Sequence, residues 1–186
     1  MRNVTLKRKI ILLVMMFLLV MACAADAKIS KTQNIADLFT RVNPSLKANK
    51  AVDYAKVVIN ASEKHKQDPY AIAALIVHES TVNPNAISKG GDYGLMQIRW
   101  RVHEKAIKKQ FPKVKKAKDI LDVRINVLYG TEIFSYCMKK ANNDLRGGVL
   151  RYSAGNNKLV GKVMATINEL RTKDGTIKKV KAKKKK

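Results

Sequence analysis

One segment of the sequence is apolar on every side of the helix that it would form. Residues 71–77 read Ala-Ile-Ala-Ala-Leu-Ile-Val and contain no polar side chain. Asp68 and Pro69 come shortly before them and suit the N-cap and first turn of a helix, which we expect from Tyr70 to about Ser80. Because a helix without a polar face has to lie inside a core, the rest of the chain must pack around this one.

The flanking sequence predicts helices that would cover the central one. Apolar residues recur at spacings of three and four, and Asp122 suits the N-cap of a helix that starts at Val123. The further helices are expected over residues 50–65, 103–110, 123–140, 145–154 and 159–171. Residues 83–94 predict a loop, and order resumes at 95–98. With an apolar content of 46%, the sequence therefore predicts a mainly α fold around a single core.

The first 27 residues have the pattern of an export signal. Basic side chains precede an uncharged run over residues 10–25, which is shorter than the roughly 20 residues that span a bilayer. Ala25-Asp26-Ala27 offers a cleavage site before Lys28. Val20-Met21-Ala22-Cys23 is a poorer match to a lipidation site, so lipid anchoring through Cys23 and an uncleaved anchor are the alternatives. All three predict an exported protein that is periplasmic or associated with the cell envelope.

Basic residues dominate the charge and gather at the C-terminus. The chain has 38 Lys and Arg against 14 Asp and Glu, and its last 15 residues hold eight Lys and one Asp. Such a segment has almost nothing to bury, so we expect a disordered tail. The chain then divides into a signal peptide, a lead-in segment, one domain and a Lys-rich tail, over residues 1–27, 28–50, 51–171 and 172–186.

Glu79 is the residue that least fits its surroundings. It closes the most apolar helix of the chain and is followed at once by a loop. A carboxyl at the end of a buried helix meets a low dielectric, which favours its neutral form and raises its pKa. A general acid needs such a raised pKa near neutral pH. From position alone, a glutamate that points to solvent is the alternative.

Several short motifs follow in a fixed order after Glu79-Ser80. They are Asn83-Pro84-Asn85-Ala86 with Ser88, then Gly94-Leu95-Met96-Gln97-Ile98, then Asn126, Tyr129 and Gly130, and finally Tyr152-Ser153-Ala154-Gly155. The ordered set resembles the lysozyme-like lytic transglycosylase (SLT) family over roughly residues 52–170. The resemblance implies a lysozyme-like single domain. Ser153 stands where the family usually has Asn, so the role of that Asn is not carried over to Ser153.

The resemblance also implies a reaction. Members of this family cut the β-1,4 bond between N-acetylmuramic acid and N-acetylglucosamine in peptidoglycan without water, leaving a 1,6-anhydro end. One glutamate acts first as acid and then as base, and by resemblance it is Glu79. Gln97 is expected to contact substrate, and Met96 to shape the cleft wall or pack in the core. Ser80 would bond the substrate, the glutamate or its own helix end, and the Tyr152 hydroxyl would orient Glu79.

Three other functions compete with this reading. Asp92 as a second carboxylate would give a lysozyme-type hydrolase, although its Gly90-Gly91 neighbours favour a turn-forming role. A noncatalytic peptidoglycan-binding protein is the second, and the intact Glu79 argues against it. A DNA-binding protein is the third, against which the export signal and the cleft motif both argue. The three histidines lack ligand spacing, so we expect neither a metal nor a cofactor.

The expected partner is the glycan strand of peptidoglycan. Beyond residue 27, the chain has 34 Lys and Arg against 13 Asp and Glu, a net charge of +21 that attracts any polyanion. After export, the anionic wall and membrane surface are favoured over nucleic acid, and the tail would tether the protein to them. We expect a monomer. Small single-domain members of the family often serve a secretion or conjugation machine, which by analogy is the alternative to general wall turnover.

Overall fold

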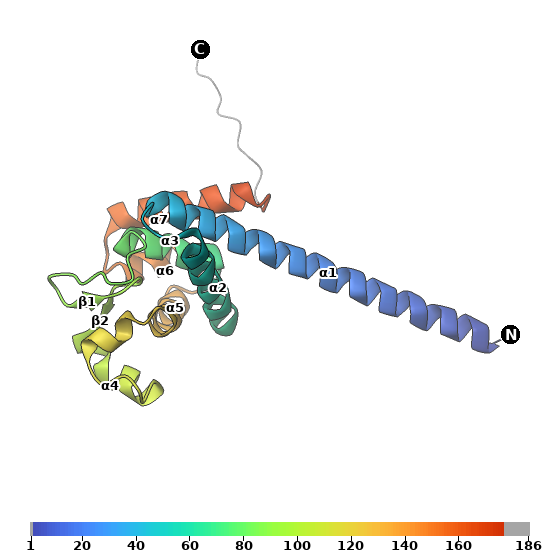
Figure 1. Ribbon diagram of the computed structural model, residues 1–186, viewed down its shortest axis with the longest axis horizontal. Coiled ribbons are helices and arrows are strands. Elements are labelled where there is room, and N and C mark those ends of the chain that lie inside the picture. The colour runs from blue at the N-terminus through green and yellow to red at the C-terminus, as the bar shows by residue number, and fades with distance from the viewer. Residues whose placement is uncertain (1, 177–186) are drawn as a thin grey trace, which may run out of the picture.

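The computed structural model describes residues 2–176, with side chains given for 12–17 and from 27 onward. The protein is mainly helical in this range, as the sequence predicts (Figure 1). Its helices are α1 (Arg2–Val42), α2 (Ala48–His65), α3 (Pro69–Ser80), α4 (Trp100–Gln110), the short 3₁₀ helix η1 (Ala117–Leu121), α5 (Val123–Lys140), α6 (Leu145–Tyr152) and α7 (Asn157–Lys173). Most of the Lys-rich tail lies outside the described residues.

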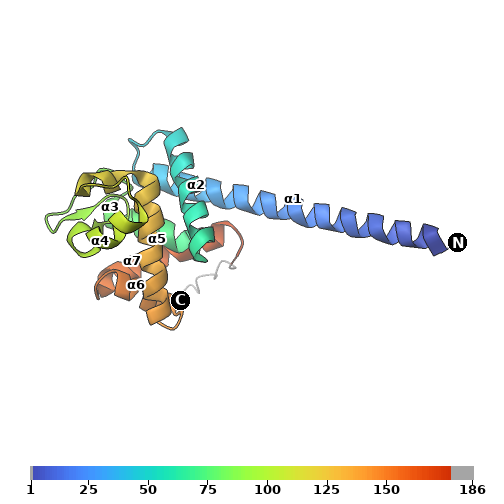
Figure 2. The same ribbon diagram turned by 90° about the horizontal axis from the view of Figure 1, so that it is seen from below.

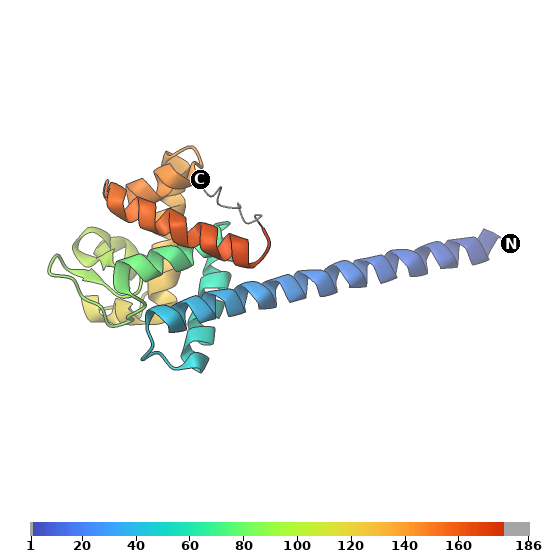
Figure 3. The same cartoon turned by 90° about the horizontal axis from the view of Figure 1, so that it is seen from above.

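Helix α3 occupies the centre of the domain. It contacts α1, α2 and α7, and Figure 3 shows it between α1 and α7. The Asp68 side chain caps its first turn by accepting from the Tyr70 N–H at 2.9 Å. Residues 70–77 are all buried. The apolar run therefore forms the core helix that its composition predicts.

Helix α1 is the longest helix in the described part of the chain. Its N-terminal part projects away from the other helices, whereas its C-terminal part packs against α2 (Figures 1 and 2). Ile35 and Phe39 are fully buried there, so residues of the expected lead-in segment belong to the main core. Within residues 2–176, none of the helices combines the length and apolar character that crossing a membrane requires.

A small hairpin interrupts the region that we expected to be a loop. Strand β1 (Asp92–Tyr93) pairs antiparallel with β2 (Ile98–Arg99), and Gly94 to Gln97 make the turn between them. Asp92 faces Arg99 across the pair. A two-stranded hairpin is marginally stable by itself, so this one depends on other elements for support.

Asn126 supplies much of that support. Its side chain is fully buried on α5 and accepts from the Met96 N–H at 2.8 Å. The same amide donates to the Tyr93 carbonyl at 2.9 Å and to the Ile120 carbonyl at 3.0 Å. A Cβ on Gly94 would approach the Asn126 nitrogen to 2.2 Å, so this contact requires glycine in the turn. Asn126 thus joins the hairpin, α5 and η1.

The last two helices differ from their predicted bounds. Helix α6 stops at Tyr152, two residues early, because Ala154 and Gly155 adopt positive φ values of 51° and 87°. Helix α7 continues to Lys173, two residues past the predicted end. Lys173 pairs with Asp37 of α1 at 2.7 Å, so a tertiary contact keeps the final turn ordered.

Candidate active site

Glu79 lies in the last turn of α3, directly before a strained segment. Thr81 and Val82 both have positive φ values, 51° and 60°. Beta-branched residues rarely adopt this left-handed conformation, which costs on the order of 1–3 kcal/mol per residue. Val82 is fully buried, so packing holds the strained turn in place. The end of α3, and Glu79 with it, is therefore fixed by the core.

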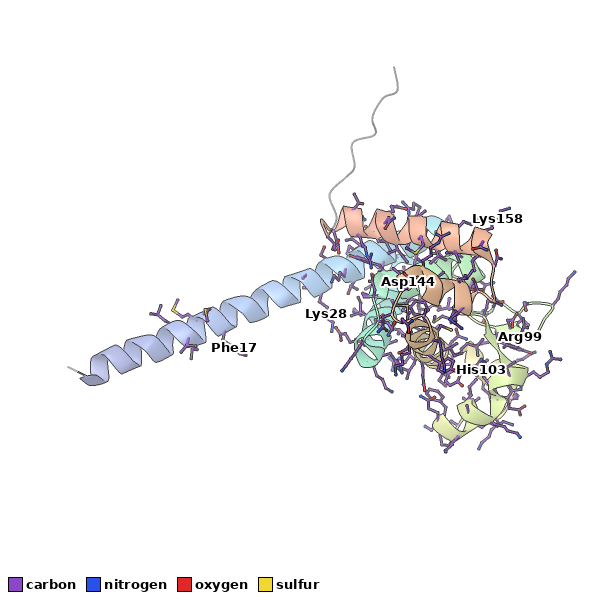
Figure 4. The ribbon with its side chains drawn as sticks, turned by 180° about the vertical axis from the view of Figure 1, so that it is seen from behind. Phe17, Lys28, Arg99, His103, Asp144 and Lys158 are labelled. Atoms are coloured by element: carbon purple, nitrogen blue, oxygen red, sulfur yellow. The ribbon has the colours of Figure 1, made fainter. Side chains whose placement is uncertain are left out.

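A cleft of about 460 Å³ opens beside Glu79. Arg99 of the hairpin and His103 of α4 line it, and Figure 4 shows both on the same side of the molecule as Lys158 at the start of α7. The other wall comes from α5 and from the segment that joins α6 to α7. The lining residues are His78, Glu79, Asp92, Gln97, Ile98, Arg99, His103, Ile133, Tyr152, Ser153, Ala154, Asn156 and Leu159.

The surroundings of the Glu79 carboxyl bring its pKa close to neutral pH. Burial raises its pKa to about 7, and the negative charge of Asp92 adds to the rise. Within the described part of the chain, no hydrogen bond or ion pair stabilises the Glu79 carboxylate. Protonated and ionised forms are therefore both populated near pH 7, which lets one group give up a proton and take one back.

Asp92 lies in the same cleft and stays ionised, whereas Glu79 is only partly ionised near pH 7. Arg99 donates to it twice, from Nε at 2.7 Å and Nη2 at 3.0 Å, and the Ser88 hydroxyl donates at 2.8 Å. These bonds, with Arg99 first, lower the pKa of Asp92 and keep it ionised. The sequence favoured a turn-forming Asp over a second carboxylate of the site, and the structure places Asp92 in the cleft wall.

Gln97 lines the cleft with a fixed orientation. Its backbone has a φ of 48°, and its Nε2 donates to the Gly94 carbonyl at 2.9 Å and the Ala86 carbonyl at 3.3 Å. The side-chain nitrogen is thus used within the turn. The amide oxygen remains as an acceptor for a hydroxyl or amide N–H group in the cleft.

Tyr152 also lines the cleft, but its hydroxyl has another partner than the one expected. It donates to the Met96 carbonyl at 2.8 Å rather than to Glu79. Its ring packs edge-on against Phe134, with centroids 5.9 Å apart. Tyr152 therefore ties the end of α6 to the hairpin turn next to Glu79. The neighbouring Ser153 bonds the Leu150 carbonyl at 3.2 Å and lines the same wall.

The side chains of Met96 and Ser80 lie behind the cleft wall. Met96 is fully buried and packs so close to Gly130 that a Cβ there would meet its Sδ at 2.5 Å. The Ser80 hydroxyl donates to the Ile76 carbonyl at 3.0 Å, which is the helix-end bond that we gave as its alternative role. Neither side chain is among the residues that line the cleft.

Two histidines enter the cleft that the sequence did not assign to it. His78 Nε2 lies 2.9 Å from the Thr166 hydroxyl, and His103 Nδ1 lies 3.4 Å from the Tyr129 hydroxyl. Burial lowers the pKa of both rings, so both favour the neutral form. The position of His78 beside Glu79 gave a signal in the sequence, whereas only the packing of α4 brings His103 there.

Comparison with known families accounts for this arrangement. A family model, the transglycosylase SLT domain, matches residues 56–173. The chain belongs to the transglycosylase SLT domain family. The match confirms the resemblance and, together with the helical architecture, the lysozyme-like SLT fold. Membership supports a function on peptidoglycan of the lytic transglycosylase type. No curated protein matches the chain.

Proposed function

We propose that this SLT-domain protein is an exported lytic transglycosylase. It cleaves the β-1,4 bond between N-acetylmuramic acid and N-acetylglucosamine and leaves a 1,6-anhydro muramoyl end. The observation that carries the proposal is the Glu79 carboxyl, which lines the cleft and has a pKa of about 7. A general acid–base group works best when its pKa lies near the operating pH.

Glu79 takes part in both proton transfers. The neutral carboxyl donates its proton to the glycosidic oxygen, and the bond from that oxygen to the muramoyl C1 breaks. The muramoyl C6 hydroxyl then attacks C1, and the Glu79 carboxylate accepts the hydroxyl proton. The enzyme returns to its starting state, and no water is consumed. Because the nucleophile belongs to the substrate, the enzyme only has to hold the C6 hydroxyl close to C1, and no water molecule is needed as a second reactant.

The other cleft residues bind and orient the sugar. The Gln97 amide oxygen accepts from a substrate hydroxyl or N-acetyl N–H group. Ile98, Ile133 and Leu159 give the cleft apolar surface on which a sugar ring packs. Tyr152 holds the hairpin turn in place through the Met96 carbonyl. We assign Met96 and Ser80 a supporting role, because their side chains pack behind the wall.

Mass spectrometry of digested peptidoglycan tests the reaction directly. Purified sacculi are incubated with the protein, and the released muropeptides are analysed without chemical reduction. We expect 1,6-anhydro ends, about 18 mass units lighter than hydrolysed reducing ends, because an intramolecular hydroxyl replaces water. Release of no muropeptides at all would support a noncatalytic peptidoglycan-binding protein instead.

Asp92 favours a lysozyme-type hydrolase as the second candidate. Retaining glycoside hydrolases place a neutral and an ionised carboxyl on either side of the scissile bond. Here Glu79 and Asp92 line one cleft with their pKa values shifted in opposite directions. In that case the products carry mostly reducing ends, which the same mass spectra distinguish.

The remaining proposals concern location and partners. Export through the predicted signal would place the enzyme at the cell envelope, where its substrate lies. The Lys-rich tail would hold it on anionic wall or membrane surfaces. By analogy with small members of the family, we propose monomeric action at a secretion or conjugation machine, with general wall turnover as the alternative. Fractionation of cells that produce the full chain, followed by immunoblotting, tests the location.

A further inference from the structure

A second hollow lies next to the cleft. It has a volume of about 610 Å³ and is formed by Tyr136 and Lys140 of α5 together with Leu150 and Arg151 of α6. Ala154 borders both this hollow and the cleft. A substrate that fills the cleft and carries a side branch can therefore place that branch in the hollow.

The hollow is cationic. Its lining includes Lys140 and Arg151 and no acidic residue. Among the described residues, neither cation forms a salt bridge, so both charges are available to a ligand. Tyr136 is 61% exposed, and the Lys140 ammonium lies 5.5 Å from the centre of its ring. The site thus combines two charges with an aromatic face and the aliphatic Leu150.

We propose that this hollow binds the peptide stem of peptidoglycan through the carboxylates of the stem. The proposal rests on the proposed function, because it places the glycan in the adjoining cleft. The stem branches from each muramic acid residue and carries free carboxylates and small aliphatic side chains. The guanidinium of Arg151 matches a carboxylate in its planar geometry, and Lys140 adds a second positive charge. Tyr136 and Leu150 would contact the aliphatic parts.

Paired substrates test the proposal. Soluble glycan strands that keep their stems are compared with the same strands after an amidase has removed the stems. The test variant is the full chain with Lys140→Gln and Arg151→Gln. On stem-bearing strands we expect its KM to rise about 3- to 10-fold with little change in kcat, since each exposed ion pair contributes modestly. On stem-free strands the two proteins should have equal KM values.

A second double variant controls for the loss of charge. Lys105→Gln with Lys109→Gln also removes two positive charges, from exposed positions on α4 that line neither the cleft nor the hollow. It should leave KM unchanged on both substrates. Equal thermal stability of all three proteins shows that the substitutions do not disturb the fold. An equal rise in KM on both substrates, or no rise on either, overturns the proposal.

Failure of the proposed function gives a different result. A hydrolase would release reducing ends and leave the KM comparison intact, whereas a noncatalytic protein would cleave neither substrate, and binding would replace activity as the readout. Fluorescence anisotropy with labelled strands then measures the affinity of the wild-type chain and of the Lys140→Gln, Arg151→Gln variant. A preference of the wild type for stem-bearing strands that the variant lacks supports the stem site even without catalysis. No such preference overturns it.

Discussion

Glu79 stays partly protonated at neutral pH because its surroundings disfavour its charge. Burial removes water from the carboxyl, and the Asp92 charge repels a second negative charge. The C-terminal end of α3 adds a negative partial charge in the same place. Arg99 neutralises part of the Asp92 charge, so the two carboxyl groups share one cleft without both becoming neutral.

The first prediction concerns the Glu79 side chain. Glu79→Gln keeps the shape of the residue but removes the transferable proton. We expect turnover of peptidoglycan to fall roughly 10²- to 10⁴-fold, the usual contribution of a general acid–base group, with binding to sacculi unchanged. Rates of muropeptide release and a sacculus pull-down measure the two quantities. Turnover within a few-fold of the wild type would rule out the assignment.

The second prediction concerns the pH dependence of the reaction. Because Glu79 has to be protonated to act as an acid, kcat should fall as pH rises through about 7. Asp92→Asn removes a like charge and so lowers the Glu79 pKa, which moves this alkaline limb to lower pH. The other charged or titratable groups of the cleft are His78, Arg99, His103 and Tyr152.

A remote carboxylate supplies the control for this pH profile. Asp53 is exposed on α2 and does not line the cleft, so Asp53→Asn should leave the alkaline limb in place. The pH dependence of kcat is measured for the three proteins side by side. An alkaline limb that stays unmoved in Asp92→Asn would show that Asp92 does not act on Glu79.

The hairpin is an element that the rest of the fold holds in position. Two residue pairs define it, and its turn carries both Gln97 and the Met96 carbonyl that bonds Tyr152. Asn126 satisfies backbone groups on both the hairpin and η1. One side chain on α5 therefore fixes the wall of the cleft opposite the end of α6.

The third prediction tests this connection between elements. Asn126→Ala leaves the Met96 N–H and the Tyr93 and Ile120 carbonyls without their partner. We expect a loss of roughly 2–4 kcal/mol in the free energy of unfolding, because buried polar groups without partners are costly. Urea unfolding measures it, and kcat/KM should fall as well. Asn157→Ala, at an exposed position on α7, is the control and should change neither quantity. A stable and active Asn126→Ala protein would contradict the proposed connection.

At the scale of the whole molecule, α1 closes one side of the core. Its buried residues belong to the main hydrophobic cluster, namely Ile35, Ala36, Leu38 and Phe39. Its ion pairs reach α7 through Asp37 with Lys173 and Arg41 with Glu169. The domain is therefore completed by a helix that begins within the expected signal sequence. The part from residue 28 onward keeps these contacts if the signal is removed.

The fourth prediction follows from this packing. Phe39→Ala should lower the free energy of unfolding by about 3–5 kcal/mol, the usual effect of removing a large buried side chain. Ile29→Ala, at a position on the same helix that is 67% exposed, should change it by less than about 0.5 kcal/mol. Chemical denaturation of both variants provides the comparison. Similar stabilities for the two would show that α1 is not part of the folded domain.

The fifth prediction concerns the basic C-terminus. Deletion of residues 177–186 retains Asp174, which accepts from the Tyr70 hydroxyl at 2.6 Å, and removes seven Lys. We expect weaker binding to intact sacculi at low salt, with unchanged cleavage of short soluble glycans. The difference should vanish as salt is raised, because screening acts over about 8 Å at physiological ionic strength. A pull-down across a salt series measures it, and equal binding at the lowest salt would leave the tail without this role.

Several structural features of this protein follow from its sequence because they depend on neighbouring residues alone. The apolar run before Glu79 required a buried helix, and Asp68 and Asp122 marked helix starts because capping involves only neighbouring residues. The position of Glu79 at the end of that helix pointed to a raised pKa but left a solvent-facing carboxyl as the alternative. These features depend on contacts within a few residues, which a sequence displays directly.

Only the tertiary structure decided the rest of the candidate site. The approach of α4 brings His103 to the cleft, and the pairing with Arg99 directs Asp92 there. The same packing turns Met96 away from the cleft and gives the Tyr152 hydroxyl a backbone carbonyl in place of Glu79. Hairpin register and the facing sides of packed helices depend on residues far apart in the chain. A motif therefore identifies which residues belong together, and packing determines which of them face the substrate.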